Sequence, residues 1–165
     1  MRIAQIRKID ITNGIGIRVS LFTQGCDINC IGCFNSDIWD YSGGKIWTKE
    51  EKESFLNLCN KPEIKGISIL GGEPLSHQNY DDLKDLFDSF KDRFPDKNIW
   101  MWTGRVFENL DSEQLEVVKL VDVLVDGPWI QEKSDFKLKY RGSSNQRIID
   151  VKKSLDTNTV VTLDI

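Results

Sequence analysis

The spacing of apolar side chains along the chain predicts an alternation of strands and helices. Residues 2–11 and 16–23 alternate apolar with polar side chains and are rich in β-branched residues, which is typical of strands. Short strands are also expected at 66–70, 97–103 and 121–125, and helices at 48–60, 79–94 and 112–120. Residues 151–165 give no clear pattern, so the role of this C-terminal segment stays open.

The order of these segments is typical of an α/β protein. Repeated strand–loop–helix units predict a mostly parallel sheet with helices packed on it. The 165 residues suit one domain, 1–165, which is long enough to bury a core. Functional loops of such sheets gather where the strands end. Unusual stretches follow four successive strands, namely the cysteine-rich loop, 71–74, 103–104 and 126–128, and we expect them to meet at one edge.

Composition and charge narrow the possible functions. There are 22 Lys and Arg against 26 Asp and Glu, a formal charge of −4 without any basic block, so nucleic acid is not expected as a partner. No apolar run reaches membrane-spanning length, and the opening MRIAQIRKID lacks the apolar core of a secretory signal. We therefore expect a cytoplasmic protein without a membrane partner, in which clustered thiols serve metal binding or catalysis.

Three cysteines within eight positions are the main chemical signal. Cys26, Cys30 and Cys33 share one loop, and no fourth cysteine is nearby. A structural zinc site needs four ligands, and a four-iron cluster usually takes four thiolates. If three thiolates hold three irons, the fourth iron is open to a small molecule. The alternatives are a zinc site completed by His77, the only histidine, and a redox-active thiol pair. Cys59 is expected to be a buried core thiol.

The arrangement of motifs resembles that of the radical S-adenosylmethionine (SAM) superfamily. The Cys-x3-Cys-x2-Cys loop after an early strand, and Gly71-Gly72-Glu73-Pro74 after the next one, carry this resemblance. Further stretches are similar to the subgroup that activates anaerobic ribonucleotide reductases. These are Asn13-Gly14-x-Gly16-x-Arg18, Trp100-x-Trp102-Thr103-Gly104, Val123-Leu124-Val125-Asp126-Gly127 and Arg141-Gly142-Ser143-Ser144-Asn145-Gln146. The resemblance covers about residues 5–150.

This resemblance has implications for fold, chemistry and partners. It implies an abbreviated, open-sided partial (β/α) barrel of the radical SAM type, since the chain is too short for six β/α units. It implies an oxidoreductase with a [4Fe-4S] cluster on Cys26, Cys30 and Cys33 that cleaves SAM reductively to a 5′-deoxyadenosyl radical. The implied product is a glycyl radical on the large subunit of anaerobic (class III) ribonucleotide reductase, with reduced flavodoxin as an electron donor. The residues expected to contact SAM are Gly32, Cys33, Phe34, Gly71, Gly72, Glu73, Pro74 and Thr103.

Other functions and local roles stay open at this stage. One alternative is another small radical SAM enzyme, such as a pyruvate formate-lyase activase-like protein, and another is a non-catalytic zinc-binding module. The Gly-Gly-Glu-Pro stretch alone is also compatible with a simple tight turn. Gly32 stands where many superfamily members carry an aromatic residue beside the SAM adenine, so the ring that contacts adenine is not assigned.

Several individual side chains keep two possible environments. Glu73 is expected either to accept a hydrogen bond or to face solvent, and Arg18 to face either solvent or the cleft. Trp100 and Trp102 share one face of a strand, which favours core packing. The polar segment 141–147 is either a loop or a docking surface.

Overall fold

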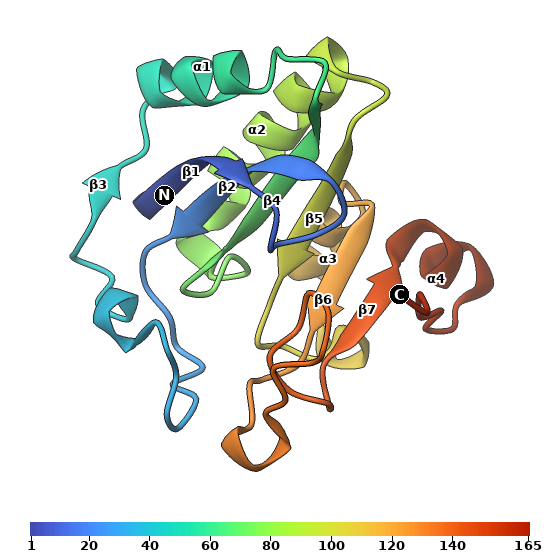
Figure 1. Cartoon of the computed structure of the whole chain (residues 1–165). Helices are drawn as coiled ribbons and strands as arrows, with labels where there is room; N and C mark the ends of the chain where they lie inside the picture. The colour runs from blue at the N-terminus through green and yellow to red at the C-terminus, as the bar shows by residue number, and fades with distance from the viewer.

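A computed structural model describes all 165 residues and has a mixed α/β fold around an open, seven-stranded sheet (Figure 1). Its strands are β1 (Arg2–Asp10), β2 (Ile17–Thr23), β3 (Lys45–Ile46), β4 (Ile64–Gly71), β5 (Asn98–Trp102), β6 (Val123–Asp126) and β7 (Arg147–Asp150). They lie in the order β3-β1-β2-β4-β5-β6-β7. The helices are α1 (Lys49–Leu58), α2 (Tyr80–Arg93), α3 (Ser112–Val118) and α4 (Val151–Thr157). Short 3-10 turns occur at Ser36–Ile38, His77–Asn79, Phe107–Asn109 and Gln131–Lys133.

The centre of the sheet is parallel and its edges are antiparallel. Strands β2, β4, β5 and β6 pair in parallel, as the sequence predicts. The prediction of a mostly parallel sheet is wrong at the edges, where β1 pairs antiparallel with β2 and β3, and β7 antiparallel with β6. The physical reason is connection length at β1, because residues 11–16 are too few for the crossover that a parallel pair needs.

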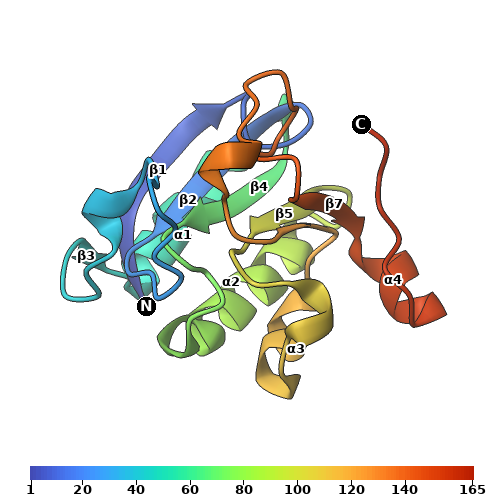
Figure 2. The ribbon, with the colours of Figure 1, turned by 90° about the horizontal axis from the view of Figure 1, so that it is seen from below.

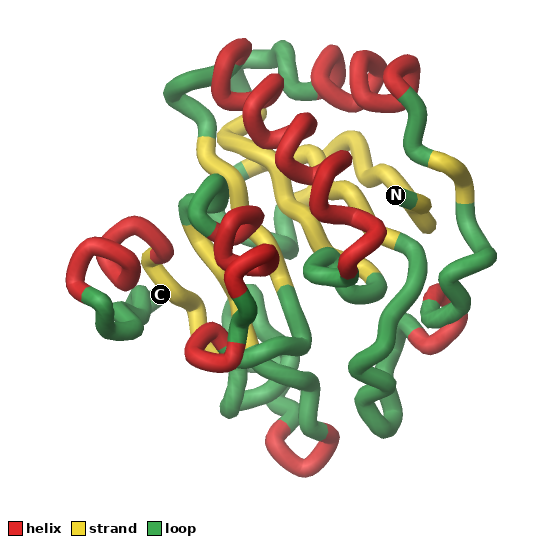
Figure 3. The backbone as a smooth tube through the Cα atoms, turned by 180° about the vertical axis from the view of Figure 1, so that it is seen from behind, coloured by secondary structure: helices red, strands yellow, loops and turns green.

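The main core lies between one face of the sheet and the helices. Side chains alternate across a strand, so Val19, Leu21, Ile67 and Ile69 all point from β2 and β4 into the largest apolar cluster. The helix α2 covers them with its predicted apolar face, comprising Leu83, Leu86, Phe87 and Phe90, all fully buried. Figure 3 shows α2 and α3 crossing this face of the sheet. None of the helices has the length and apolar character needed to cross a bilayer.

The opposite face of the sheet carries a different set of side chains. Arg18, Ser20 and Ser68 are fully buried there, and Trp100 anchors a small second apolar cluster with Val125 and Ile148. No helix from α1 to α3 covers this face, which is closed mainly by loops (Figures 1 and 3). This loop-covered face is where the functional cavity lies.

Helix boundaries follow local capping. Thr48 begins α1 by accepting a hydrogen bond from the Glu51 backbone N–H at 3.2 Å. Cys59 ends α1 and is fully buried, so the prediction of a core thiol is confirmed. The C-terminal segment that gave no clear pattern contains α4, which begins where the Asp150 side chain accepts from the Lys153 N–H at 3.0 Å.

Candidate active site

Four loops meet at the carboxyl edge of the parallel strands (Figure 2). Their residues line a cavity of about 430 Å³. The cysteine loop follows β2, and Gly72 and Glu73 follow Gly71, the last residue of β4. Thr103 and Gly104 follow β5, and Gly127 follows β6. The predicted convergence of four strand ends is therefore confirmed. Cavities of this size are typical of small-molecule sites.

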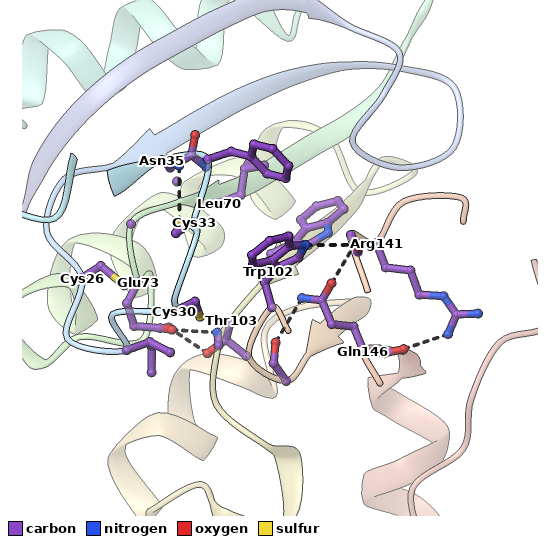
Figure 4. A pocket seen from close by; sticks show the side chains of 18 of the residues that line it. Cys26, Cys30, Cys33, Asn35, Leu70, Glu73, Trp102, Thr103, Arg141 and Gln146 are labelled. Atoms are coloured by element: carbon purple, nitrogen blue, oxygen red, sulfur yellow. Dashed lines mark hydrogen bonds between the residues drawn. The ribbon is translucent and has the colours of Figure 1, made fainter. Parts of the chain in front are cut away.

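All three clustered cysteines line this cavity. Cys26, Cys30 and Cys33 are free thiols of intermediate burial (Figure 4). Burial raises the pKa of the Cys26 thiol, with the backbone N–H groups of Ile28 and Asn29 acting in the opposite direction. Burial also raises the pKa of Cys30, where the Trp129 N–H opposes it. Such N–H groups point at the sulfurs and stabilise thiolates, the form that binds iron.

The donor set suits an iron–sulfur cluster better than a single zinc ion. No group of three or more His, Cys, Asp or Glu side chains is close enough to hold one metal ion. A four-iron cluster takes each thiolate on a separate iron, so its ligands need not converge on one point. His77, the expected fourth zinc ligand, is not part of the cavity wall and its side chain is 81% exposed. The alternative of a zinc site with His77 is therefore wrong.

The Gly71–Gly72 turn packs directly on the start of the cysteine loop. Gly71 has φ of +113°, and a Cβ on Gly72 would lie 2.1 Å from the Gly25 carbonyl oxygen. The Glu73 N–H donates to that same carbonyl at 2.8 Å, and the Gly72 N–H donates to the Thr23 carbonyl at 2.9 Å. Glycine is needed here because any side chain would separate two backbones that touch. The Gly-Gly-Glu-Pro stretch is therefore more than a simple tight turn, because it joins the loop after β4 to the cysteine loop.

Glu73 is a fully buried carboxylate that accepts three hydrogen bonds. Its oxygens accept from the Thr103 hydroxyl at 2.7 Å (Figure 4). They also accept from the backbone N–H groups of Leu75 and Gly104, both at 2.8 Å. Burial raises the pKa of Glu73, and these three donors act against that rise. Of the two environments expected for Glu73, the hydrogen-bonded one is confirmed. Thr103 thus donates a hydrogen bond to Glu73 and also lines the cavity.

Arg18 faces neither solvent nor cleft, and both environments expected for it are wrong. The side chain is fully buried, with Nε donating to Ser68 Oγ at 2.7 Å and Nη1 to Asn98 Oδ1 at 2.8 Å. Its guanidinium lies 5.5 Å from the ring centre of Trp100, and burial lowers its pKa to about 10. Since Nη1 also donates to the Ile15 carbonyl at 3.1 Å, Arg18 anchors the β1–β2 loop from below.

The β1–β2 loop supplies two cavity residues that were not among the expected SAM contacts, although Asn13 belongs to a stretch that carried the family resemblance. Thr12 and Asn13 line the cavity, and the buried Asp10 carboxylate holds both. Its oxygens accept from Thr12 N and Oγ1, each at 2.8 Å, and from Asn13 Nδ2 at 2.7 Å. Asn13 stands beside the Gly14-x-Gly16 pattern, which was the available signal that this loop needs a special backbone.

Aromatic side chains form much of the remaining wall. Trp100 is buried, as expected for core packing. Trp102 packs against the same small apolar cluster, but it is only half-buried and also lines the cavity. Trp129, which no sequence pattern singled out, lines the cavity and packs edge-on against Phe34, with ring centres 5.3 Å apart. A Cβ on Gly32 would lie 3.3 Å from the Trp129 ring. Gln131 Oε1 would lie closer still, 2.7 Å from that Cβ, so Gln131 and Trp129 together occupy the space beside Gly32 that an aromatic side chain there would need.

The expected SAM contacts do not all reach the cavity. Cys33, Phe34, Gly71, Gly72, Glu73 and Thr103 line it, whereas Gly32 and Pro74 do not. Arg141 lines the opposite wall and donates through Nη1 to the Gln146 carbonyl at 2.7 Å. Gln146 Oε1 in turn accepts from the N–H groups of Gly142 and Ser143 at 2.8 and 3.1 Å. Residues 141–146 form a loop that closes one side of the site, and Arg147 begins β7.

Comparison with known proteins agrees with this donor set. The family model for the 4Fe-4S single cluster domain matches residues 12–149. An anaerobic ribonucleoside-triphosphate reductase-activating protein of Escherichia coli (strain K12) is 41% identical over 148 residues, covering 88% of this chain and 96% of that protein. Proteins of the same name from Enterobacteria phage T4 and Vibrio cholerae are 40% identical over 148 residues and 39% identical over 150 residues. Each match covers 90% of this chain, and 93% and 97% of those relatives respectively.

The fold and the cysteine-lined cavity thus define a protein of the iron–sulfur class, with a single four-iron cluster. Within that class, the chain belongs to the family of anaerobic ribonucleoside-triphosphate reductase-activating proteins.

Proposed function

We propose that this protein activates an anaerobic ribonucleotide reductase by generating a glycyl radical on it. The observation that carries the proposal is the meeting of Cys26, Cys30 and Cys33 with the Gly71–Gly72 turn in one cavity. Three thiolates leave one iron of a [4Fe-4S] cluster free, and SAM is the small molecule that this free position would bind. When bound and reduced, the cluster supplies the electron that splits SAM into methionine and a 5′-deoxyadenosyl radical.

The protein's own residues bind and orient SAM. The turn at Gly71 and Gly72 presents backbone to the cavity without side chains, which lets the methionine end of SAM approach closely. Glu73 and Thr103 form the adjoining wall and keep their hydrogen bonds to each other, so they hold the wall rigid. The half-buried rings of Trp102 and Trp129 provide flat apolar surfaces of the kind on which an adenine base stacks.

The mouth of the cavity suits a protein substrate. Phe34 lines the cavity yet is 73% exposed. Ile31 in the cysteine loop is 86% exposed, and Phe136, two residues before the cavity-lining Leu138, is 93% exposed. Exposed apolar side chains grouped around a site are typical of protein-binding surfaces. The loop at 141–146 contributes to the same rim. This arrangement supports the reductase's glycine-containing loop as the substrate, because a backbone glycine can reach a radical only through an open mouth.

The proposal includes four further elements. The open sheet with a parallel centre is an abbreviated, open-sided partial barrel of the radical SAM type. Residues 1–165 act as a single radical SAM domain. Reduced flavodoxin is the electron donor, and the cytoplasm is the compartment in which the protein works.

Electron paramagnetic resonance tests the proposal directly. The reconstituted protein is mixed under nitrogen with its host's anaerobic reductase, SAM and a reductant, and the spectrum is recorded. We expect a glycyl-radical doublet that collapses to a singlet when the glycine of the reductase carries deuterium at its α carbon. The Cys26→Ala variant should give no signal, whereas Cys59→Ala, which removes a thiol outside the cavity, should retain it.

Two outcomes would contradict the proposal. A glycyl signal on pyruvate formate-lyase, with none on the reductase, would favour the pyruvate formate-lyase activase-like alternative. Absence of 5′-deoxyadenosine from all reactions that contain reduced cluster and SAM would exclude radical SAM chemistry altogether.

A further inference from the structure

Arg105 lies in the loop after β5 and contacts the other three loops that line the cavity, although it is not itself part of the wall. Its Nη2 donates to both carboxylate oxygens of Asp27, at 2.8 and 3.0 Å, in the cysteine loop. Its Nε donates to the carbonyl of Leu75, just after the Gly71–Pro74 turn, at 3.2 Å. Its backbone N–H donates to the Thr103 hydroxyl at 3.1 Å, and its carbonyl accepts from the Gly127 N–H at 2.7 Å.

The cysteine loop has few hydrogen bonds of its own. Its start is held by the Gly25 and Cys26 N–H groups, which donate to the carbonyls of Ile38 and Trp39 at 2.8 and 3.1 Å. The only other backbone bond within the three-cysteine stretch joins the Cys33 N–H to the Cys30 carbonyl at 3.1 Å. The loop also contains a non-glycine residue with positive φ, Asn29 at 52°. Contacts from other loops must therefore fix its shape.

The first half of the loop is seated on the β5 loop that carries Arg105. A Cβ on Gly104 would lie 2.8 Å from the Ile28 side chain, so Gly104 leaves the space that Ile28 fills. Asp27, the residue before Ile28, receives the Arg105 ion pair. The Arg105 side chain is 25% exposed and the Asp27 side chain 51%, so the pair sits at the protein surface, behind the cavity. The packing of Ile28 on Gly104 and the ion pair of Asp27 with Arg105 thus attach the segment between Cys26 and Cys30 to the β5 loop.

We propose that Arg105 is a positioning residue that fixes the first half of the cysteine loop against the Gly71–Pro74 turn. In doing so, it sets the place of Cys26 relative to the glycines that face SAM. The consequence for SAM rests on the proposed function, whereas the consequence for the loop does not. The planar guanidinium uses two different nitrogens, Nη2 for the Asp27 carboxylate and Nε for the Leu75 carbonyl, so it joins two loops at a fixed angle. The single ammonium group of lysine does not reproduce this geometry.

Hydrogen–deuterium exchange of the cluster-free protein tests the loop directly. In Arg105→Met and in Asp27→Asn, exchange of peptides covering residues 25–35 should become roughly two- to fivefold faster, the range expected for a partly exposed ion pair. Exchange in β4 and α2 should stay unchanged. The double variant should be no faster than either single one, because both substitutions remove the same contact. Arg105→Lys should recover part of the protection.

Arg93→Met is the matched control, because Arg93 also forms a partly exposed ion pair, with Glu53, but this pair joins α2 to α1 and neither residue lines the cavity. The proposal is overturned if the loop exchanges at the wild-type rate in both site variants, if Arg93→Met accelerates it equally, or if the two single effects add. It is also overturned if exchange accelerates throughout the sheet, because that result describes general destabilisation.

A second measurement on the reconstituted protein tests the consequence for SAM. Arg105→Met should keep the wild-type iron content, since all three ligands remain, and should bind SAM roughly two- to fivefold more weakly by calorimetry. Wild-type SAM affinity in a variant with a loosened loop would overturn the positioning role. If the wild-type protein itself did not bind SAM, the proposed function would fail, while the exchange result would still decide the role of Arg105 in the loop.

Discussion

Asp10→Asn should destabilise the cluster-free protein by removing the charge that organises the β1–β2 loop. Asp10 is 4% exposed, and burial alone would raise its pKa. Hydrogen bonds from Asn13, Thr12 and Ser20 outweigh burial and lower the pKa from 3.8 to about 2. A lowering of this size corresponds to about 2 kcal/mol of stability at neutral pH, present only while the carboxylate is ionised.

The sign of the pH dependence follows from the lowered pKa. Because the folded protein holds the ionised form more tightly than the unfolded chain does, the stabilisation is complete above pH of about 4 and is lost as pH falls towards 2. Asparagine cannot ionise, so its variant lacks this contribution at every pH. The stability curves of the wild type and Asp10→Asn should therefore converge in acid.

Urea unfolding measured between pH 7 and pH 3 provides the assay. At pH 7 we expect a loss of about 2 kcal/mol, equivalent to roughly 4–8 °C in melting temperature for a chain of this length. Asp88→Asn, at an exposed position on α2, is the control and should change stability little. Equal stability of wild type and Asp10→Asn at pH 7, or a difference that stays constant down to pH 3, would refute the reasoning.

Three further predictions concern the cavity. Cys59→Ala should keep the full iron content, measured after anaerobic reconstitution, because its thiol lies in the core and burial raises its pKa to about 12. Cluster loss equal to that of a Cys26→Ala variant would contradict the three-ligand site. Gly72→Ala should lower SAM affinity, measured by calorimetry, more than iron content, because its Cβ would overlap the Gly25 carbonyl and displace the turn. Trp129→Ala should make the cluster bleach faster in air than Trp129→Phe does, because an aromatic ring at this position packs beside Phe34 of the cysteine loop. Identical bleaching of the two variants would show that the ring does not protect the cluster.

The sequence predicted the site better than it predicted the sheet. Cysteine spacing and the glycine turn are local patterns at strand ends, and a parallel sheet brings strand ends together whatever its edges do. The antiparallel pairing of β1 and β7 depends instead on which neighbour each strand meets. The short connection at residues 11–16 was the available indication of a hairpin, and it concerned β1 alone.

Side-chain environments were less predictable because they depend on partners distant in sequence. Arg18 is an example. The alternation of side chains along β2 predicts the face of the sheet on which Arg18 lies, but it does not predict that Ser68 and Asn98 accept hydrogen bonds from its guanidinium there. Trp129 is another, because its contact with Gly32 joins positions almost a hundred residues apart. By contrast, the apolar face of α2 followed directly from helical periodicity.

The two halves of the site differ in how far apart their residues lie along the chain. The three cysteines come from one short stretch, so they stay close to one another even in an unfolded chain, and iron bound there stabilises the fold little. The walls expected to contact SAM come from separate loops between Gly71 and Gln146, which only the finished sheet brings together. We therefore expect a partly unfolded protein to retain iron affinity after it has lost SAM affinity. The order of assembly follows: the chain can capture metal early, but it gains a SAM site, and with it the ability to make a radical, only once folding is complete.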